Sequence, residues 1–151
     1  MHAAIYYLDT APWSNSFLKK IFKFDLLVRR YTKDHEWVDT TDDGIIVGIT
    51  EFAQDQLGDV VSVELPEVGI SYRHNDAIAI IDSVKTSTDV YSPVDGRVTH
   101  VNESLLSQPE LINKSPYQDG WIVKMMPESP AQLESLLTKD QYDESVGNTE
   151  K

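Results

Sequence analysis

The stretch Asp82-Ser83-Val84-Lys85-Thr86-Ser87-Thr88-Asp89-Val90-Tyr91-Ser92-Pro93 decides how this chain folds. The apolar run 77–81 leads into it, and the β-rich run 86–91 leads out and stops at Pro93, which cannot donate to a strand ladder. Two strand signals separated by a few polar residues predict a β-hairpin. Lys85 is therefore expected at or near the tip, where a flexible stem presents a modifiable amine to solvent.

Further strand signals lie on both sides of this hairpin. They begin at Trp37 and include 44–49 after a turn at 42–44, 60–65 before Pro66, 96–101, and 121–125. A short helix is expected over 51–57, with Thr50 as its N-cap and Gly58 as its stop. Many short strands separated by turns predict a mainly β fold, either a small sandwich or a barrel.

The C-terminal third carries weaker signals. Residues 102–120 are predicted to form a long polar loop. Ser129 and Pro130 predict the N-cap and first residue of a helix with three leucines on one face, Leu133, Leu136 and Leu137. A capping box over 138–141 fits one further turn or short helix, and residues 143–151 are expected to fray.

Composition excludes several classes of protein. A length of 151 residues predicts one domain with tails, and no apolar run is long enough to span a membrane. The chain has no cysteine, which excludes disulfides, thiol catalysis and cysteine-ligated metals. A net charge of −12 argues against nucleic-acid binding and favours basic surfaces of protein partners, although such charge often serves only solubility. The four histidines are scattered without ligand spacing, so no metal site is expected.

Residues 1–30 differ from the rest of the chain. They hold five basic and two acidic residues, a net charge of +3, so the remaining residues carry −15. Apolar and basic residues over 18–27 suggest a short amphipathic helix, which resembles an organelle transit peptide. The sequence Arg29-Arg30-Tyr31 resembles a cleavage context for a matrix protease. The alternatives are a simple N-terminal extension or non-native sequence from a misplaced start.

The hairpin sequence resembles the lipoylation motif of the glycine cleavage H-protein family. That motif runs Glu-Ser-Val-Lys, then small residues, an acidic residue and a Ser-Pro turn. Residues 82–85 depart from it only by Asp for Glu, and Asp89 and 92–93 fall in the matching places. Other segments match the family in order and spacing: 31–38, 49–60, 96–102, 111–117 and 119–121. The resemblance covers about residues 31–138.

The resemblance implies a non-catalytic carrier with lipoate covalently attached to Lys85. It implies a small barrel-sandwich hybrid of the lipoyl and biotinyl carrier type, mainly β, with a short internal helix and a C-terminal helix. The implied partners are glycine decarboxylase (the P protein), aminomethyltransferase (the T protein), dihydrolipoamide dehydrogenase (the L protein) and a lipoylating enzyme. Nucleic acid and membranes are not among them, and a monomer is expected.

These inferences divide the chain into three parts. Residues 1–30 are an N-terminal extension with transit-peptide character, 31–128 the lipoyl carrier domain, and 129–151 a C-terminal helix with a frayed acidic tail. The extension predicts the mitochondrial matrix or a related organelle, or the cytoplasm if the chain is bacterial.

The resemblance also implies a cleft that receives the aminomethyl-loaded arm. Glu36 and Asp89 occupy positions that help to line it, and Asp34 stands where the family often has a small polar residue. A carboxylate there can hold a protonated amine and keep water from the labile centre. The alternative is that Glu36 caps a strand edge and Asp89 simply faces solvent. Four aromatic residues are expected to belong to the core rather than to a cofactor site: Trp37, Tyr91, Tyr117 and Trp121.

Three other functions compete with this one. A biotinyl carrier places methionines on both sides of its lysine, whereas Val84 and Thr86 stand here. A lipoyl-relay protein, which delivers lipoate to other enzymes, would carry the same motif. An unmodified interaction module would carry no group on Lys85, which intact mass would reveal.

Overall fold

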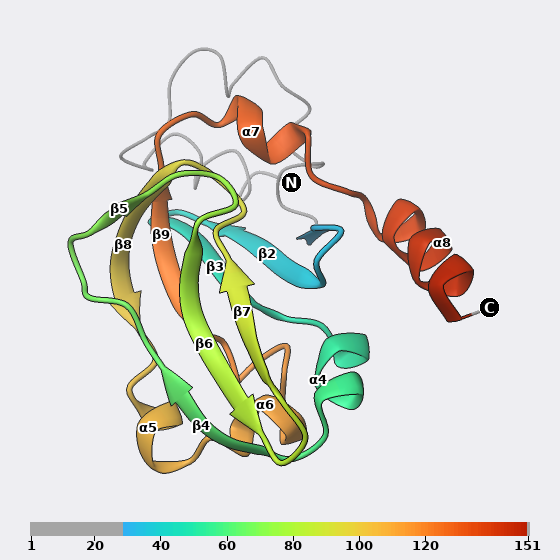
Figure 1. Ribbon diagram of the computed structural model, residues 1–151. Helices are drawn as coiled ribbons and strands as arrows, with labels where there is room; N and C mark the ends of the chain where they lie inside the picture. The colour runs from blue at the N-terminus through green and yellow to red at the C-terminus, as the bar shows by residue number, and fades with distance from the viewer. Residues whose placement is uncertain (1–28, 151) are drawn as a thin grey trace.

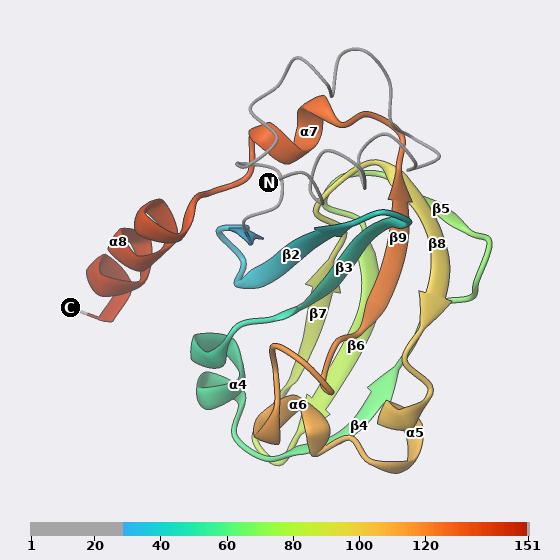
Figure 2. The same cartoon turned by 180° about the vertical axis from the view of Figure 1, so that it is seen from behind.

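The computed structural model describes residues 29–150, which form two antiparallel sheets facing one another (Figures 1 and 2). One sheet has six strands in the order β1-β2-β3-β9-β8-β5, and the other has three in the order β4-β6-β7. The strands are β1 (Arg30–Tyr31), β2 (Glu36–Thr41), β3 (Gly44–Ile49), β4 (Val60–Glu64), β5 (Ser71–Tyr72), β6 (Ala77–Ser83), β7 (Ser87–Tyr91), β8 (Gly96–Val101) and β9 (Val123–Pro127). The helices are α4 (Glu51–Leu57), α5 (Ser104–Ser107), α6 (Leu111–Lys114), α7 (Ala131–Glu134) and α8 (Lys139–Glu150). The mainly β barrel-sandwich prediction is confirmed.

The hydrophobic core lies between the two sheets. Val47, Val98 and Met125 contribute to it from the larger sheet, and Ile81 and Val90 from the smaller one; each is at most 1% exposed. Alternation along each strand produces this arrangement, because every second side chain points to the same face. The core fixes both strands of the β6–β7 hairpin and therefore the position of its tip.

Local capping signals predicted α4 correctly. The helix begins after Thr50, whose side chain accepts a hydrogen bond from the Ala53 N–H. It ends at Gly58, where a φ of 76° lies in the left-handed region that favours glycine. Helix α4 stands beside the β6–β7 hairpin in both views (Figures 1 and 2).

The prediction of a polar loop over 102–120 is wrong, because this segment contains α5 and α6. Leu105 and Ile112 are completely buried and anchor the two helices to the main core. Each helix has only four residues, too few to show a helical repeat in the sequence. Strand β9 also begins at Val123, two residues later than predicted, because Asn102 donates side-chain hydrogen bonds to the carbonyls of Asp119 and Trp121.

The C-terminal predictions are partly correct. Helix α7 is a single turn without a side-chain cap from Ser129, although Leu133 and Leu136 are buried as expected. The capping box is confirmed: the Thr138 N–H donates to Gln141 Oε1 at 2.9 Å, and the Gln141 N–H donates to Thr138 Oγ1 at 3.2 Å. The expected fraying of residues 143–150 is wrong, because α8 continues to Glu150.

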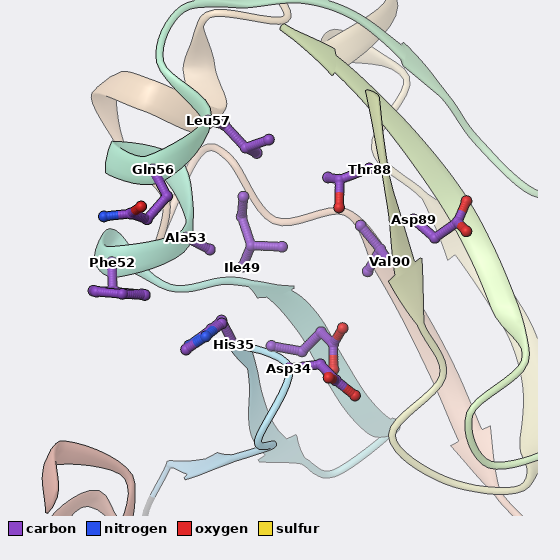
Figure 3. A pocket seen from close by; sticks show the side chains of 11 residues that line it. Asp34, His35, Ile49, Phe52, Ala53, Gln56, Leu57, Thr88, Asp89 and Val90 are labelled. Atoms are coloured by element: carbon purple, nitrogen blue, oxygen red, sulfur yellow. The ribbon is translucent and has the colours of Figure 1, made fainter. Parts of the chain in front are cut away.

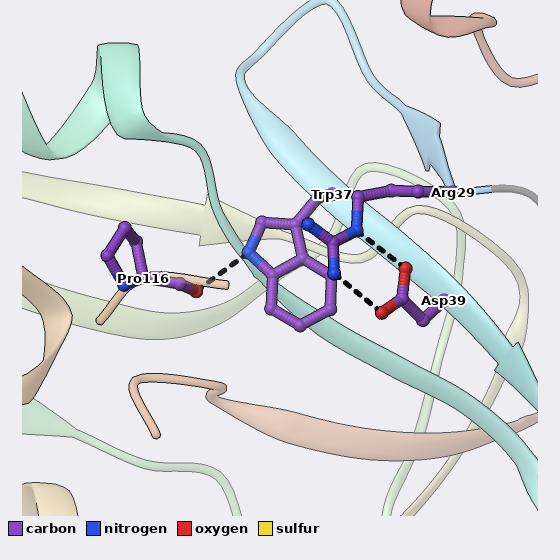
Figure 4. A network of polar contacts seen from close by, with 4 residues as sticks. All are labelled: Arg29, Trp37, Asp39 and Pro116. Atoms are coloured by element: carbon purple, nitrogen blue, oxygen red, sulfur yellow. Dashed lines mark hydrogen bonds and ion pairs between the residues drawn. The ribbon is translucent and has the colours of Figure 1, made fainter. Parts of the chain in front are cut away.

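The first described residues are built into the larger sheet. The Tyr31 N–H donates to the Leu137 carbonyl at 2.9 Å and its carbonyl accepts from the Leu137 N–H at 2.8 Å. Arg29 makes a bidentate ion pair with Asp39, at 2.7 and 2.8 Å, and lies 4.6 Å from the ring centre of Trp37 (Figure 4). Arg29 and Arg30, which lie inside the range assigned to the extension, are therefore already part of the carrier domain. The helix expected over 18–27 lies outside the described residues.

Of the four aromatic residues predicted to belong to the core, Trp37 is fully buried and the other three are half-buried. Trp37 is 1% exposed and donates its indole N–H to the Pro116 carbonyl at 2.9 Å (Figure 4). Tyr117 and Trp121 are half-buried against the cluster that contains Trp37, and Tyr91 is also half-buried.

In the part of the chain from 29 to 150, no helix is long and apolar enough to cross a membrane.

Candidate functional site

Lys85 lies in the turn between β6 and β7, as predicted. Ser83 organises this turn: its N–H donates to the Thr86 carbonyl at 2.8 Å, and its Oγ accepts from the N–H groups of Lys85 and Thr86, both at 3.2 Å. Serine hydroxyls stabilise turns in this way. The Val84 N–H also donates to the Asp59 carbonyl at 2.9 Å, which ties the tip to the segment after α4. The backbone beneath Lys85 is therefore held on two sides.

The Lys85 amine is available for covalent modification. The residue is exposed, and its ammonium has no hydrogen bond or ion pair with any residue between 29 and 150. Its aliphatic stem lies against Gly58, where an added methyl group would approach Lys85 Cε to 3.2 Å. An exposed amine on an ordered turn fits a group attached through an amide bond.

A cleft of about 290 Å³ lies beside this hairpin (Figure 3). Helix α4 forms one wall, β7 the opposite wall, and the segment 34–36 closes one end. Its lining residues are Asp34, His35, Glu36, Ile49, Phe52, Ala53, Gln56, Leu57, Thr88, Asp89 and Val90. The lining is thus apolar at its centre with acidic groups at one end and along one edge.

Lys85 lies next to both walls of the cleft. Leu57 lines the cleft, and the next residue, Gly58, contacts the Lys85 stem. On the other wall Thr88 lines the cleft three residues after Lys85 along the hairpin. A group on Lys85 therefore starts at the edge of this cleft.

Glu36 is the buried acid of the cleft. It is 2% exposed, its Oε2 accepts from the Tyr91 N–H at 3.1 Å, and its Oε1 accepts a short hydrogen bond from the Thr32 hydroxyl. Burial raises the pKa of Glu36 to about 7; the nearby Asp34 also raises it, while the bonds from Thr32 and Tyr91 act in the opposite direction. This carboxyl can change its charge near neutral pH.

The other two predicted acids lie differently. Asp34 and Asp89 both line the cleft, but both are exposed. Thr88 and Val90 point into the cleft from β7, whereas the Asp89 carboxylate points away from its centre (Figure 3). Alternation along the strand produces this difference. The structure therefore brings the three acids to one cleft, and the roles of Asp34 and Asp89 stay predictions.

Two aromatic groups of the cleft were not predicted from the sequence. His35 and Phe52 line it, with ring centres 4.7 Å apart. From the sequence, His35 was grouped with three other histidines that show no ligand spacing. Its position next to Glu36 nevertheless indicated that it belongs to the same site. Phe52 and Gln56 face the cleft from successive turns of α4, a spacing readable once the helix was predicted.

Comparison with known proteins agrees with this geometry. The family model described as "Glycine cleavage H-protein" matches residues 29–149. The chain is 52% identical over 116 residues to the glycine cleavage system H protein of Listeria welshimeri serovar 6b, covering 77% of this chain and 93% of that protein. It is 50% identical over 117 residues to the probable glycine cleavage system H protein of Aeropyrum pernix, covering 78% and 82%. It resembles the crystal structure of a glycine cleavage system H protein from Mycobacterium marinum with a TM-score of 0.73 and 35% identity, over 80% of this chain and 98% of that chain.

Proposed function

This chain belongs to the glycine cleavage H-protein family, the lipoyl carriers of the glycine cleavage system, and we propose that Lys85 is the residue that carries its lipoyl group. The protein is a carrier subunit and not an enzyme. The observation that supports Lys85 is its exposed, unpaired amine on a turn ordered by Ser83 and anchored to Asp59. Lipoate on this amine supplies a dithiolane that opens to two thiols, and the protein supplies its placement.

The cleft residues have a distinct task in this proposal. Glu36 in its ionised form binds the protonated amine of the aminomethyl cargo, a charge-assisted contact strengthened by burial. Phe52 and Leu57 exclude water from the same space. Asp89 adds negative charge along one edge of the cleft, and Asp34 adds it at the closed end. The buried carboxyl supports aminomethyl transport in preference to simple lipoate relay.

The proposed partners are the enzymes of the same system. They are glycine decarboxylase, which supplies the aminomethyl group, a folate-dependent aminomethyltransferase, which takes it, and dihydrolipoamide dehydrogenase, which reoxidises the thiols. A lipoylating enzyme must first modify Lys85. The net charge of −12 favours encounter with basic surfaces on these proteins.

Intact mass measurement tests the attachment site. Produced with an active lipoylation system, the chain should gain the mass of one lipoyl group. Lys85→Ala and Lys85→Arg should both abolish this gain, because neither side chain can form the amide. Lys114→Arg and Lys124→Arg are the matched controls and should be modified normally. Modification that persists in both Lys85 variants would assign the lipoyl group elsewhere.

We also propose that residues 1–28 are dispensable for the carrier and act as a targeting segment. The contacts of Arg29 with Asp39 and Trp37 support a carrier that begins at Arg29. A chain that starts at Arg29 should unfold cooperatively and accept lipoate as the full chain does. Residues 1–28 fused to a reporter should direct it to mitochondria in a eukaryotic cell, and a reporter left in the cytosol would reject the targeting role.

A further inference from the structure

A chain of three hydrogen-bonding side chains connects the C-terminal helix to the cleft. The Tyr142 hydroxyl of α8 lies 2.8 Å from His35 Nδ1 and 2.7 Å from Thr50 Oγ1. His35 lines the cleft, and Thr50 is the N-cap of α4, which forms one cleft wall. Tyr142 therefore touches both the closed end and the helical wall of the cleft.

Burial fixes the direction of these hydrogen bonds. Thr50 is 0% exposed and Tyr142 is 5% exposed, so each hydroxyl hydrogen needs an acceptor inside the protein. Thr50 Oγ1 already accepts from the Ala53 N–H, and within the described chain the remaining partner for its hydrogen is the Tyr142 oxygen. Tyr142 must then donate its own hydrogen to His35 Nδ1. Any other arrangement leaves one buried hydroxyl hydrogen without an acceptor.

The surrounding residues hold this geometry in place. Tyr31 stacks on Tyr142 with ring centres 4.8 Å apart and planes 9° apart. The His35 backbone has a φ of 72°, an uncommon value for a residue with a side chain, and its carbonyl accepts from the Thr50 N–H at 2.9 Å. The His35 ring itself packs against Phe52, with ring centres 4.7 Å apart, and edge-on to Tyr142 at 5.6 Å, which restricts its rotation away from Tyr142.

We propose that Tyr142 is a positioning residue for the cleft: it donates to His35 Nδ1 and so holds the ring in the neutral form that carries its hydrogen on Nε2. This role in the cleft rests on the proposed function, while the tautomer itself follows from the hydrogen bonds alone. A neutral ring adds no positive charge to the site where Glu36 receives a cationic amine. Burial lowers the pKa of His35 and supports the neutral form, although the nearby Asp34 acts in the opposite direction.

Nitrogen NMR of the histidine rings in the full, unlipoylated chain tests the tautomer directly. At pH 8 the Nδ1 of His35 should show the chemical shift of an unprotonated acceptor, and its Nε2 that of a protonated donor. The exposed His74 serves as the internal reference. Because this measurement needs no variant, it is decisive even if a substitution destabilises the fold. A protonated Nδ1 on His35 would overturn the proposal.

Two matched variants then test whether Tyr142 sets this state. Tyr142→Phe keeps the stack on Tyr31 but removes the hydroxyl, so His35 should populate both tautomers and become protonated at a higher pH than in the wild type. Tyr31→Phe keeps both ring and hydroxyl of Tyr142, so His35 should be unchanged. An unchanged His35 spectrum in Tyr142→Phe would overturn the assignment of Tyr142.

The loaded protein provides the functional measurement. Tyr142→Phe should accept lipoate at Lys85 normally but release its aminomethyl cargo faster than Tyr31→Phe does. Equal release from these two variants would reject the positioning role. If Lys85 were not lipoylated at all, the proposed function would fail, yet the NMR experiment would still decide the tautomer.

Discussion

Replacing Glu36 with glutamine should remove a pH-dependent loss of stability from this protein. The carboxyl is 2% exposed and accepts hydrogen bonds from the Thr32 hydroxyl and the Tyr91 N–H. Glutamine has nearly the same shape, and its oxygen can still accept from Tyr91. Its amide cannot ionise, so the variant isolates the effect of placing a charge in the closed end of the cleft.

The pKa of Glu36 determines the sign and size of the effect. In the folded state it is about 7, against an ordinary value of 4.5, which we take for the unfolded chain. Between these values the folded protein keeps the proton that the unfolded chain has lost, so stability falls as pH rises. At 1.36 kcal/mol per pKa unit the full loss is about 3 kcal/mol, reached above pH 7. An imperfect hydrogen bond from the new amide to Thr32 would offset about 1 kcal/mol of the gain.

Urea denaturation of the wild type and Glu36→Gln at a series of pH values between 5 and 8 measures this effect. At pH 8 the variant should be more stable than the wild type by about 2 kcal/mol, and this advantage should disappear by pH 5. His35 contributes a dependence of opposite sign, because burial lowers its pKa, but it is present in both proteins and cancels in their difference.

Asp89→Asn is the matched control, since it also removes one carboxylate from the cleft lining but at an exposed position. Its stability should differ from the wild type by less than about 0.5 kcal/mol throughout the series. A constant difference between Glu36→Gln and the wild type from pH 5 to 8 would show that Glu36 ionises without cost. That result would refute the claim that burial raises the pKa of Glu36.

Three further measurements give separate tests. Glu36→Gln should speed loss of the aminomethyl cargo about tenfold to hundredfold, as expected for one charge-assisted contact of roughly 1.5–3 kcal/mol, and Asp89→Asn should have less effect because its carboxylate is exposed. The rate at which the loaded protein loses its cargo, measured without the folate-dependent partner, tests both variants. A rate in Glu36→Gln equal to that of the wild type would show that Glu36 does not bind the cargo. Arg29→Ala should lower the free energy of unfolding by about 1 kcal/mol through loss of the Asp39 pair and the contact with Trp37. Arg29→Lys should lose less because it keeps a positive charge beside Asp39, although its ammonium cannot bind the carboxylate bidentately. Leu105→Ala should cost about 2–5 kcal/mol in urea denaturation, whereas Leu106→Ala, at a site 63% exposed, should be nearly neutral; similar values would contradict the burial of α5.

The parts of the fold that the sequence determined are those held by local chemistry. The β6–β7 hairpin needs only two β-rich runs and a polar turn, and Ser83 supplies the turn's hydrogen bonds from within it. The ends of α4 follow from Thr50 and Gly58, and the start of α8 from the capping box at Thr138. Each signal acts over three or four residues, so it can be read before the chain is folded.

Tertiary contacts decided the features that carry no local signal. Helices α5 and α6 are stabilised by burial of Leu105 and Ile112 in the core. Helix α8 continues through the residues that were expected to fray, and its Tyr142 packs on Tyr31. A four-residue helix has no readable period, and a polar helix without a strong apolar face resembles a frayed tail.

The site divides in the same way. Lys85 was found from its motif and its turn, because an exposed tip depends on few distant residues. The state of Glu36 required the structure, since burial in the folded chain raises its pKa and the hydrogen bond from the distant Tyr91 N–H opposes that rise. The same is true of His35, whose hydrogen-bond partner Tyr142 is 107 residues away. Sequence spacing reports local hydrogen bonds, whereas desolvation and long-range partners arise only when the folded chain closes around a side chain.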